Sequence, residues 1–145
     1  MDNINIFEPE WDVPKNIYAL QTTRNSNLIK EPLNKNKNKN KNKTKLLTNV
    51  GFEFISKKAI GLNQSHSNTS VELPSDDRDA DASYTTRNKV VCSIRTADCM
   101  PLLITDEAGS FVAAIHAGWR GLASGIIENT LKKINAKGKF IVWIG

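Results

Sequence analysis

Three side chains in this 145-residue sequence have types that could do chemistry together: His66 and His116, the only two histidines, and Cys99, one of two cysteines. A thiolate and imidazoles suit zinc, and three protein ligands with a fourth position left open are typical of catalytic zinc. A partly buried cysteine and a hydrogen-bonded histidine at a strand end are the metal-free alternative. Cys92 lies within an apolar segment, which favours an inert core thiol.

The local pattern places two of these residues at the open end of a predicted hairpin. Residues 102–105 and 111–115 read as strands, and the link between them contains a glycine and has a hairpin's length. In the register that we expect from this link, Cys99 faces Ala117. Facing residues have Cβ atoms about 4.5–5.5 Å apart. Cys99 and His116 could therefore contact the same ion.

Further short strands and one helix are predicted around this hairpin. Apolar positions recur at helical spacing after Gly121, and we expect the helix to end near Gly138, with lysines at its C-terminal end. Residues 140–144 form a continuous apolar run, typical of a strand that is buried on both faces. Other strands are expected at 16–22 and 90–94, and a polar loop at 74–81.

Residues 34–45 alternate asparagine and lysine, with one threonine and no apolar side chain. Such a tract cannot bury enough surface to offset its conformational entropy, so we expect a low-complexity insertion within one domain spanning 1–145. The chain has a formal charge of +5, and six of its lysines lie in this tract, so the remainder is slightly acidic. The charge therefore does not indicate nucleic acid as a partner.

The sequence contains no stretch approaching the ~20 apolar residues that a membrane span needs. Its first ten residues are acidic and lack the apolar core of a secretory signal. Two cysteines without such a signal favour free thiols in a reducing compartment. We therefore expect a cytoplasmic protein with no membrane partner.

Several short segments resemble the signatures of the laccase-domain (polyphenol oxidase) family. The two most specific are TADCMP at 96–101 and HAGWRG at 116–121. Members of this family have been called multicopper polyphenol oxidases, purine nucleoside phosphorylases and, in one bacterial branch, peptidoglycan editing factor. The other similar segments are QSH at 64–66, ADA at 80–82, and the opening W-x-x-P and TTR elements at 11–14 and 22–24.

The resemblance implies a mixed-sheet α/β/β/α sandwich with a zinc site formed by His66, Cys99 and His116. It also implies phosphorolysis of adenosine, inosine and methylthioadenosine, accompanied by adenosine deamination. The expected partners are then a purine nucleoside and phosphate. Zinc suits both reactions, because it polarises a bound phosphate or water. Asp81 lies in a polar loop, where acids are usually solvated, and its catalytic role rests on the resemblance alone.

Among the motif residues, Cys99, His116 and Asp98 are the candidate catalytic groups. Arg24 and Arg120 are the candidates for holding the phosphate anion. Arg120 could equally stack on the neighbouring tryptophan or tie down a loop. Asp98 could cap a turn instead of contacting a ligand.

The sequence also departs from the family's pattern. Residues 25–28 stand where the family has a glycine pair, and the Asn/Lys tract occupies a region of further pocket residues. The chain ends at Gly145, where family members continue with a long carboxyl-terminal portion. We therefore expect the amino-terminal part of such a domain, truncated at its C-terminus, with a complementary carboxyl-terminal chain as a candidate partner.

Two other functions remain open. Cys99 could be the nucleophile of a hydrolase with His116 as its base, which would suit cleavage of a peptidoglycan precursor. The chain could instead be a non-catalytic remnant. Copper-dependent phenol oxidation is less favoured, because one cysteine and two histidines cannot supply several copper sites.

Overall fold

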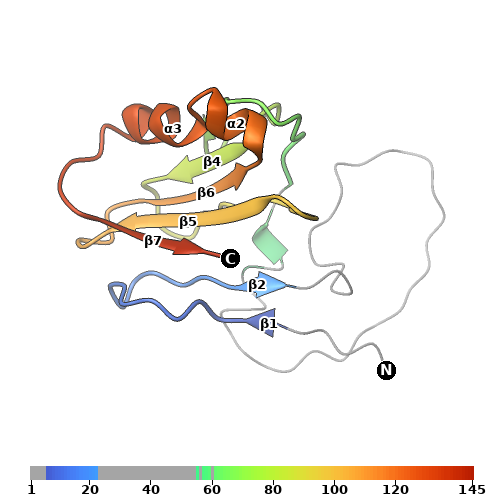
Figure 1. The fold of residues 1–145 in the computed structure, drawn as a ribbon. Helices are drawn as coiled ribbons and strands as arrows, with labels where there is room; N and C mark the ends of the chain where they lie inside the picture. The colour runs from blue at the N-terminus through green and yellow to red at the C-terminus, as the bar shows by residue number, and fades with distance from the viewer. Residues whose placement is uncertain (1–5, 23–54, 56, 60) are drawn as a thin grey trace, which may run out of the picture.

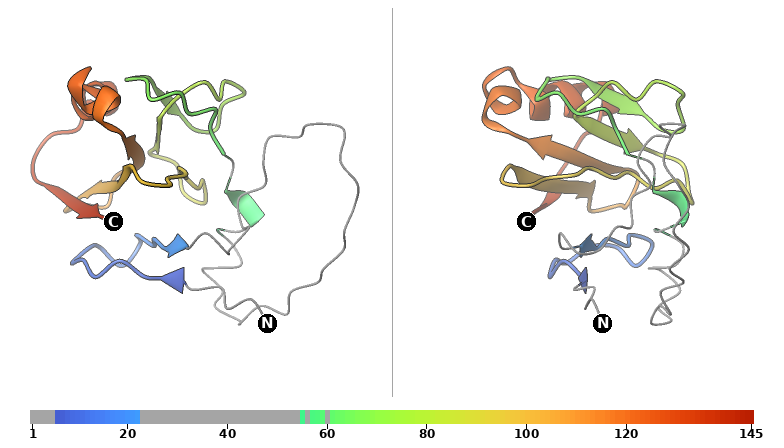
Figure 2. Two further views of the ribbon diagram at one scale, coloured as in Figure 1. Left: turned by 45° about the vertical axis from the view of Figure 1, so that its right-hand side comes forward. Right: turned by 90° about the vertical axis from the view of Figure 1, so that its right-hand side faces the viewer.

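The computed structural model describes residues 6–22, 55, 57–59 and 61–145. Within these residues two helices pack on one face of a five-stranded sheet, and a two-stranded sheet lies on the opposite side (Figure 1 and Figure 2). The expected mixed-sheet α/β class is confirmed. The strands are β1 (Ile6–Phe7), β2 (Gln21–Thr22), β3 (Ser70–Glu72), β4 (Ala82–Thr85), β5 (Met100–Asp106), β6 (Val112–Ala117) and β7 (Phe140–Ile144), and the helices are α2 (Trp119–Ala123) and α3 (Ile126–Ile134).

The five-stranded sheet has the order β3-β4-β6-β5-β7. β3 and β4 run parallel, and every other neighbouring pair is antiparallel, so the sheet is mixed. The predicted hairpin is β5 and β6, at the centre of the sheet. β1 and β2 form a separate antiparallel pair. Of the expected strand at 16–22, only Gln21–Thr22 is a strand.

The hairpin register differs by one residue from the expected one. Met100, and not Cys99, lies opposite Ala117. The cause lies in the turn, where the Asp106 carboxylate accepts hydrogen bonds from both the amide and the hydroxyl of Ser110. Thr105 consequently pairs with the residue after Phe111, while its hydroxyl donates to the Phe111 carbonyl at 2.7 Å. The turn includes one residue more than its sequence suggested.

The single predicted helix is two helices separated by a glycine. Gly125 has φ +85°, in the left-handed region, and interrupts the helix between α2 and α3. α3 ends at Ile134, before the expected end near Gly138, because Asn135 takes a left-handed conformation with φ +53° and its amide bonds to the Lys132 carbonyl. The lysines of the last turn still lie where they complement the helix dipole.

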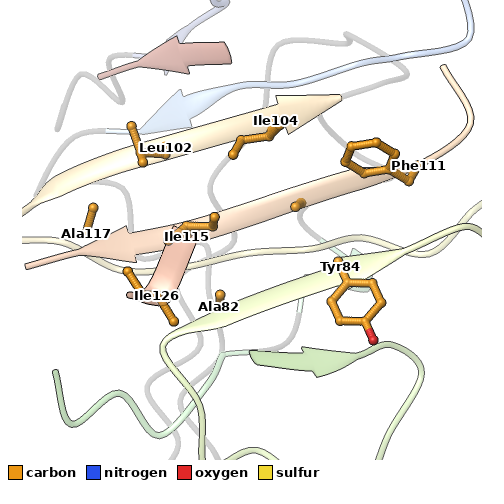
Figure 3. Close-up of a cluster of buried hydrophobic side chains, with 9 residues drawn as sticks. Ala82, Tyr84, Leu102, Ile104, Phe111, Ile115, Ala117 and Ile126 are labelled. Atoms are coloured by element: carbon orange, nitrogen blue, oxygen red, sulfur yellow. The ribbon is translucent and has the colours of Figure 1, made fainter. Parts of the chain in front are cut away.

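The hydrophobic core lies between the sheet and α3. Alternate residues of β4, β5 and β6 face the helix, as a period of two requires, and Ile126 of α3 contacts them without any solvent exposure. Ile127, Leu131 and Ile134 extend this contact along the helix. The residues labelled in Figure 3 are Ala82, Tyr84, Leu102, Ile104, Phe111, Ile115, Ala117 and Ile126.

One predicted strand is absent, two observed strands were not predicted, and the predicted loop is confirmed. Residues 90–94 form no strand. The inner strands β4 and β6 already pair with another strand on each side, so neither can pair with this segment. β3 and β4 were missed because buried polar residues, among them Ser83 and Thr85, interrupt the apolar pattern. Residues 74–81 contain no helix or strand, as expected.

Strand β7 is not buried on both faces as expected. It is the edge strand and pairs with β5. Phe140, Val142 and Ile144 are between 37% and 60% exposed. They lie on the same side of the sheet as α3, but α3 packs on β3, β4 and β6. This part of the sheet is therefore an apolar surface without a covering element among the described residues.

The Asn/Lys tract at 34–45 and the candidate phosphate ligand Arg24 lie outside the described residues. Among the residues that are described, no helix is both long and apolar enough to cross a membrane.

Candidate metal centre

The structure brings together His66, Cys99 and His116 from three separate segments. Their metal-binding atoms all lie within 4.8 Å of one another. Cys99 Sγ is 3.6 Å from His66 Nε2, and the two imidazole rings meet edge to face with centroids 4.8 Å apart. Cys99 comes just before β5 and His116 lies near the end of β6, beside the start of α2 (Figure 1). His66 lies on a segment outside this hairpin, so the hairpin pattern could not predict its position beside Cys99.

Gln64 fixes the segment that carries His66. Its side-chain amide donates to the Arg95 carbonyl at 2.6 Å, and its side-chain oxygen accepts from the Arg95 amide at 2.7 Å. This pair of bonds ties the 64–66 segment to the chain that leads into Cys99. The Gln-x-His spacing therefore has a physical reason, because the glutamine holds the histidine beside the cysteine.

Asp81 is the residue of this site that the sequence indicated only through the resemblance. It is fully buried, although its position in a polar loop suggested a solvated carboxylate. Its two oxygens accept the amides of Ser65, His66 and Ser67 at 2.7–3.1 Å and the hydroxyl of Ser67 at 2.7 Å. Its Oδ1 is also 2.7 Å from His116 Nδ1. One carboxylate thus contacts the backbone of one candidate ligand and the ring of another.

The three amides that point at Asp81 require an unusual backbone at the middle residue. His66 has φ +63°, a left-handed conformation that costs a residue with a side chain free energy. Successive amides in such a bend converge on one anion. The Asp81 carboxylate stabilises this strained bend, and the bend turns the His66 ring toward Cys99.

The hydrogen bonds of Asp81 outweigh its burial. Burial alone would raise the pKa of a carboxyl group, but the bonds from His116, Ser67 and Ser65 hold the pKa of Asp81 below its ordinary value of 3.8. Asp81 is therefore ionised at neutral pH and can only accept hydrogen bonds.

The charge of Asp81 determines the tautomer of His116. Because the carboxylate only accepts, Nδ1 of His116 carries the proton that is shared with Asp81. The lone pair of the neutral ring is then on Nε2. A carboxylate that orients a histidine in this way is the usual outer partner of a metal-binding imidazole.

Gly118 leaves the space in which the three side chains meet. A Cβ atom at this position would lie 2.8 Å from His66 Cδ2 and 3.2 Å from Cys99 Sγ. Its backbone is ordinary, with φ −73°, so the requirement for glycine is one of space and not of conformation. This close approach explains the first glycine of the HAGWRG segment.

The two cysteines differ in surroundings as expected. Cys92 Sγ lies 3.8 Å from the Val112 carbonyl, and burial raises the pKa of this thiol to about 12, so it stays protonated and unreactive. Cys99 is half-buried at the candidate site. Both thiols are free.

Two further candidates of the sequence, Asp98 and Arg120, are exposed. Asp98 is exposed, with Oδ1 3.8 Å from Cys99 Sγ. Arg120 is exposed too, and its guanidinium carbon lies 4.7 Å from the centroid of the Trp119 ring. The stacked arrangement of Arg120 is therefore one of the two that were expected.

Comparison with known proteins places the chain in a family. A family model described as multi-copper polyphenol oxidoreductase laccase matches residues 18–145. The chain belongs to this family. It is 40% identical to a purine nucleoside phosphorylase of Haemophilus influenzae over 94% of its own length and 60% of the relative's length. It is 37% identical to a purine nucleoside phosphorylase of Pseudomonas aeruginosa, with the same shares covered.

The structural comparison agrees with the sequence comparison. A Neisseria meningitidis protein of known crystal structure matches 97% of this chain and 62% of its own with a TM-score of 0.70 and 31% identity. The chain thus spans about 60% of the length of its curated relatives.

Proposed function

We propose that this chain provides the metal centre of a zinc-dependent purine nucleoside phosphorylase. Its substrates would be adenosine, inosine and methylthioadenosine with phosphate, and the same site would deaminate adenosine. The observation that carries the proposal is the convergence of His66, Cys99 and His116, with the His116 proton held by Asp81. The names of the relatives support the choice of reaction.

The donor set fits zinc. Bonds of about 2.3 Å to sulfur and about 2.1 Å to nitrogen at a tetrahedral angle place the two atoms ~3.6 Å apart. The observed separation of Cys99 Sγ and His66 Nε2 is 3.6 Å. The lone pair of His116 Nε2 would supply the third donor, and the three donor atoms lie within 4.8 Å of one another. A single thiolate with two imidazoles suits one zinc ion better than several copper ions.

Bound zinc would act as a Lewis acid that polarises a phosphate or water oxygen. In phosphorolysis a phosphate oxygen attacks the anomeric carbon of the ribose while the bond to the base nitrogen breaks, so phosphate must be held beside the sugar. Arg120 and Arg24 would hold the anion. Asp98, exposed beside Cys99, would accept a hydrogen bond from the substrate. His116 would keep its Nδ1 hydrogen bond to Asp81 and present Nε2 to the ion.

One observation favours a second candidate, a thiol hydrolase acting on a peptidoglycan precursor. Cys99 Sγ lies beside an imidazole nitrogen, as in a nucleophile and base pair. The neighbouring ring is that of His66, however, whereas the expected base, His116, bonds to Asp81. Metal separates the two functions, because a nucleophilic thiol stays active with a chelator and a zinc enzyme does not.

The test is phosphate-dependent release of hypoxanthine from inosine by the purified chain, with and without a chelator. Cys99→Ala is the variant and Cys92→Ala the matched control. The proposal expects release that needs phosphate, stops on chelation and returns with zinc. A chain with zinc bound but no release would act as a remnant or require a complementary carboxyl-terminal chain, and adding that portion of a relative distinguishes the two.

A further inference from the structure

Three large apolar side chains that neighbour the candidate metal centre along the chain are exposed. Met100 directly follows Cys99 and is 45% exposed. Trp119 directly follows Gly118 and is 68% exposed, the largest value among the described large hydrophobic residues. Leu122 lies one helical turn after Gly118, whose carbonyl accepts the Leu122 amide, and is 42% exposed. We call Met100, Trp119 and Leu122 the apolar rim.

The geometry of α2 places Trp119 and Leu122 of this rim beside the metal centre. The position of a Cβ on Gly118 would touch both His66 and Cys99, so this side of the helix faces the cluster. Leu122, four residues later, projects from nearly the same side of the helix. Trp119 directly follows Gly118 in the chain. Gly121, three residues after Gly118, lies on this side of α2 too, where an added Cβ atom would be 3.0 Å from the Ser67 carbonyl oxygen.

Trp119 has one face engaged and the rest of its ring exposed. The Arg120 guanidinium lies 4.7 Å from the ring centroid. A planar cation on one face of an indole leaves the other face for a flat ligand. Small-molecule sites combine apolar and aromatic walls with a few polar groups. Here the polar groups are those of the metal centre.

We propose that the apolar rim is the subsite for the purine base, with Trp119 stacking on the base. This inference rests on the proposed function for its choice of ligand. A heteroaromatic base matches an open indole face in shape, and the flexible thioether of Met100 adapts to the ring edge. Stacking on the free face of Trp119 would place the ribose toward the metal centre.

The experiment measures base binding separately from catalysis. Inosine is titrated into the zinc-loaded chain without phosphate, and binding is followed by equilibrium dialysis and by tryptophan fluorescence. Trp119→Leu should weaken inosine binding ~10- to 100-fold, in the range of one base stacked on an aromatic ring, and Trp119→Phe should retain most of the affinity. Ribose, which has no base, should bind equally weakly to all variants.

Trp11→Phe is the control, because it removes another of the three tryptophans at a position remote from α2. It should keep both the affinity and the fluorescence change. Trp119 is largely exposed, so its replacement should leave the unfolding temperature unchanged. Unchanged inosine affinity in Trp119→Leu, or no inosine binding by the wild type, would overturn the subsite. Inosine binding that depends on Trp119 but gives no hypoxanthine release, even after the carboxyl-terminal portion of a relative is added, would refute the phosphorylase and leave the subsite standing.

Discussion

Replacing Asp81 by asparagine should disturb both histidines of the metal centre at once. The buried carboxylate accepts five hydrogen bonds. The side-chain oxygen of asparagine can still accept hydrogen bonds from the His116 ring and the His66 amide. The amide nitrogen, however, would point its own hydrogens at the amides of Ser65 and Ser67.

The size of the effect follows from the two orphaned backbone amides. Each donor left without an acceptor costs about 1–3 kcal/mol, so we expect the two amides to lower the free energy of unfolding by about 2–6 kcal/mol. The His66 bend loses the anion that stabilises it, and His116 loses a charged partner for Nδ1. Loss of such an outer partner lowers metal affinity ~10- to 100-fold.

Urea unfolding and a zinc competition titration measure the two effects. Asp106→Asn is the matched control, because Asp106 also accepts the amide and hydroxyl of a serine but lies at the far end of the hairpin. It should lose stability and keep its zinc affinity. Ser67→Ala removes one bond from Asp81 and is the milder variant if Asp81→Asn does not fold. Equal zinc affinity in the wild type and both site variants would refute the positioning role of Asp81.

Three further predictions follow from the same structure. Gly118→Ala should lower zinc affinity at least tenfold, since its methyl group would lie 2.8 Å from His66 Cδ2, whereas Leu122→Ala, on the same helix, should not. The folded state lowers the pKa of Asp81, so the carboxylate should stabilise the fold fully above about pH 4. This stabilisation should be lost as the pH falls through the lowered pKa. Acid unfolding that is identical in Asp81→Asn and the wild type would contradict this. Val142→Lys, on the exposed face of β7, should raise the concentration at which the chain self-associates in sedimentation experiments.

The central hairpin and the cysteine and histidine at its open end could be predicted from local pattern alone. Apolar runs separated by a short link identified β5 and β6, but their register depended on how Asp106 binds Ser110, a side-chain contact that the pattern does not contain. Helical spacing located α3, and only the conformation of Gly125 decides that α2 is separate.

The rest of the site depends on contacts between distant segments. His66 lies beside Cys99 because Gln64 bonds to the backbone of Arg95, 31 residues along the chain. Asp81 looked like one acid among several in a polar loop, and only its burial against residues 65–67 and His116 distinguishes it from its neighbours. Short motifs indicated these residues through resemblance, while composition and spacing gave no signal for them.

The most direct test of the account is the zinc content of the purified chain and four variants after dialysis against excess zinc. The account predicts one zinc ion per wild-type chain, the same for Cys92→Ala, and loss of that ion in His66→Ala, Cys99→Ala and His116→Ala. Circular dichroism of each variant shows whether the fold persists. A wild-type chain without zinc, or a folded variant of the three ligands that still binds one equivalent with unchanged affinity, would contradict it.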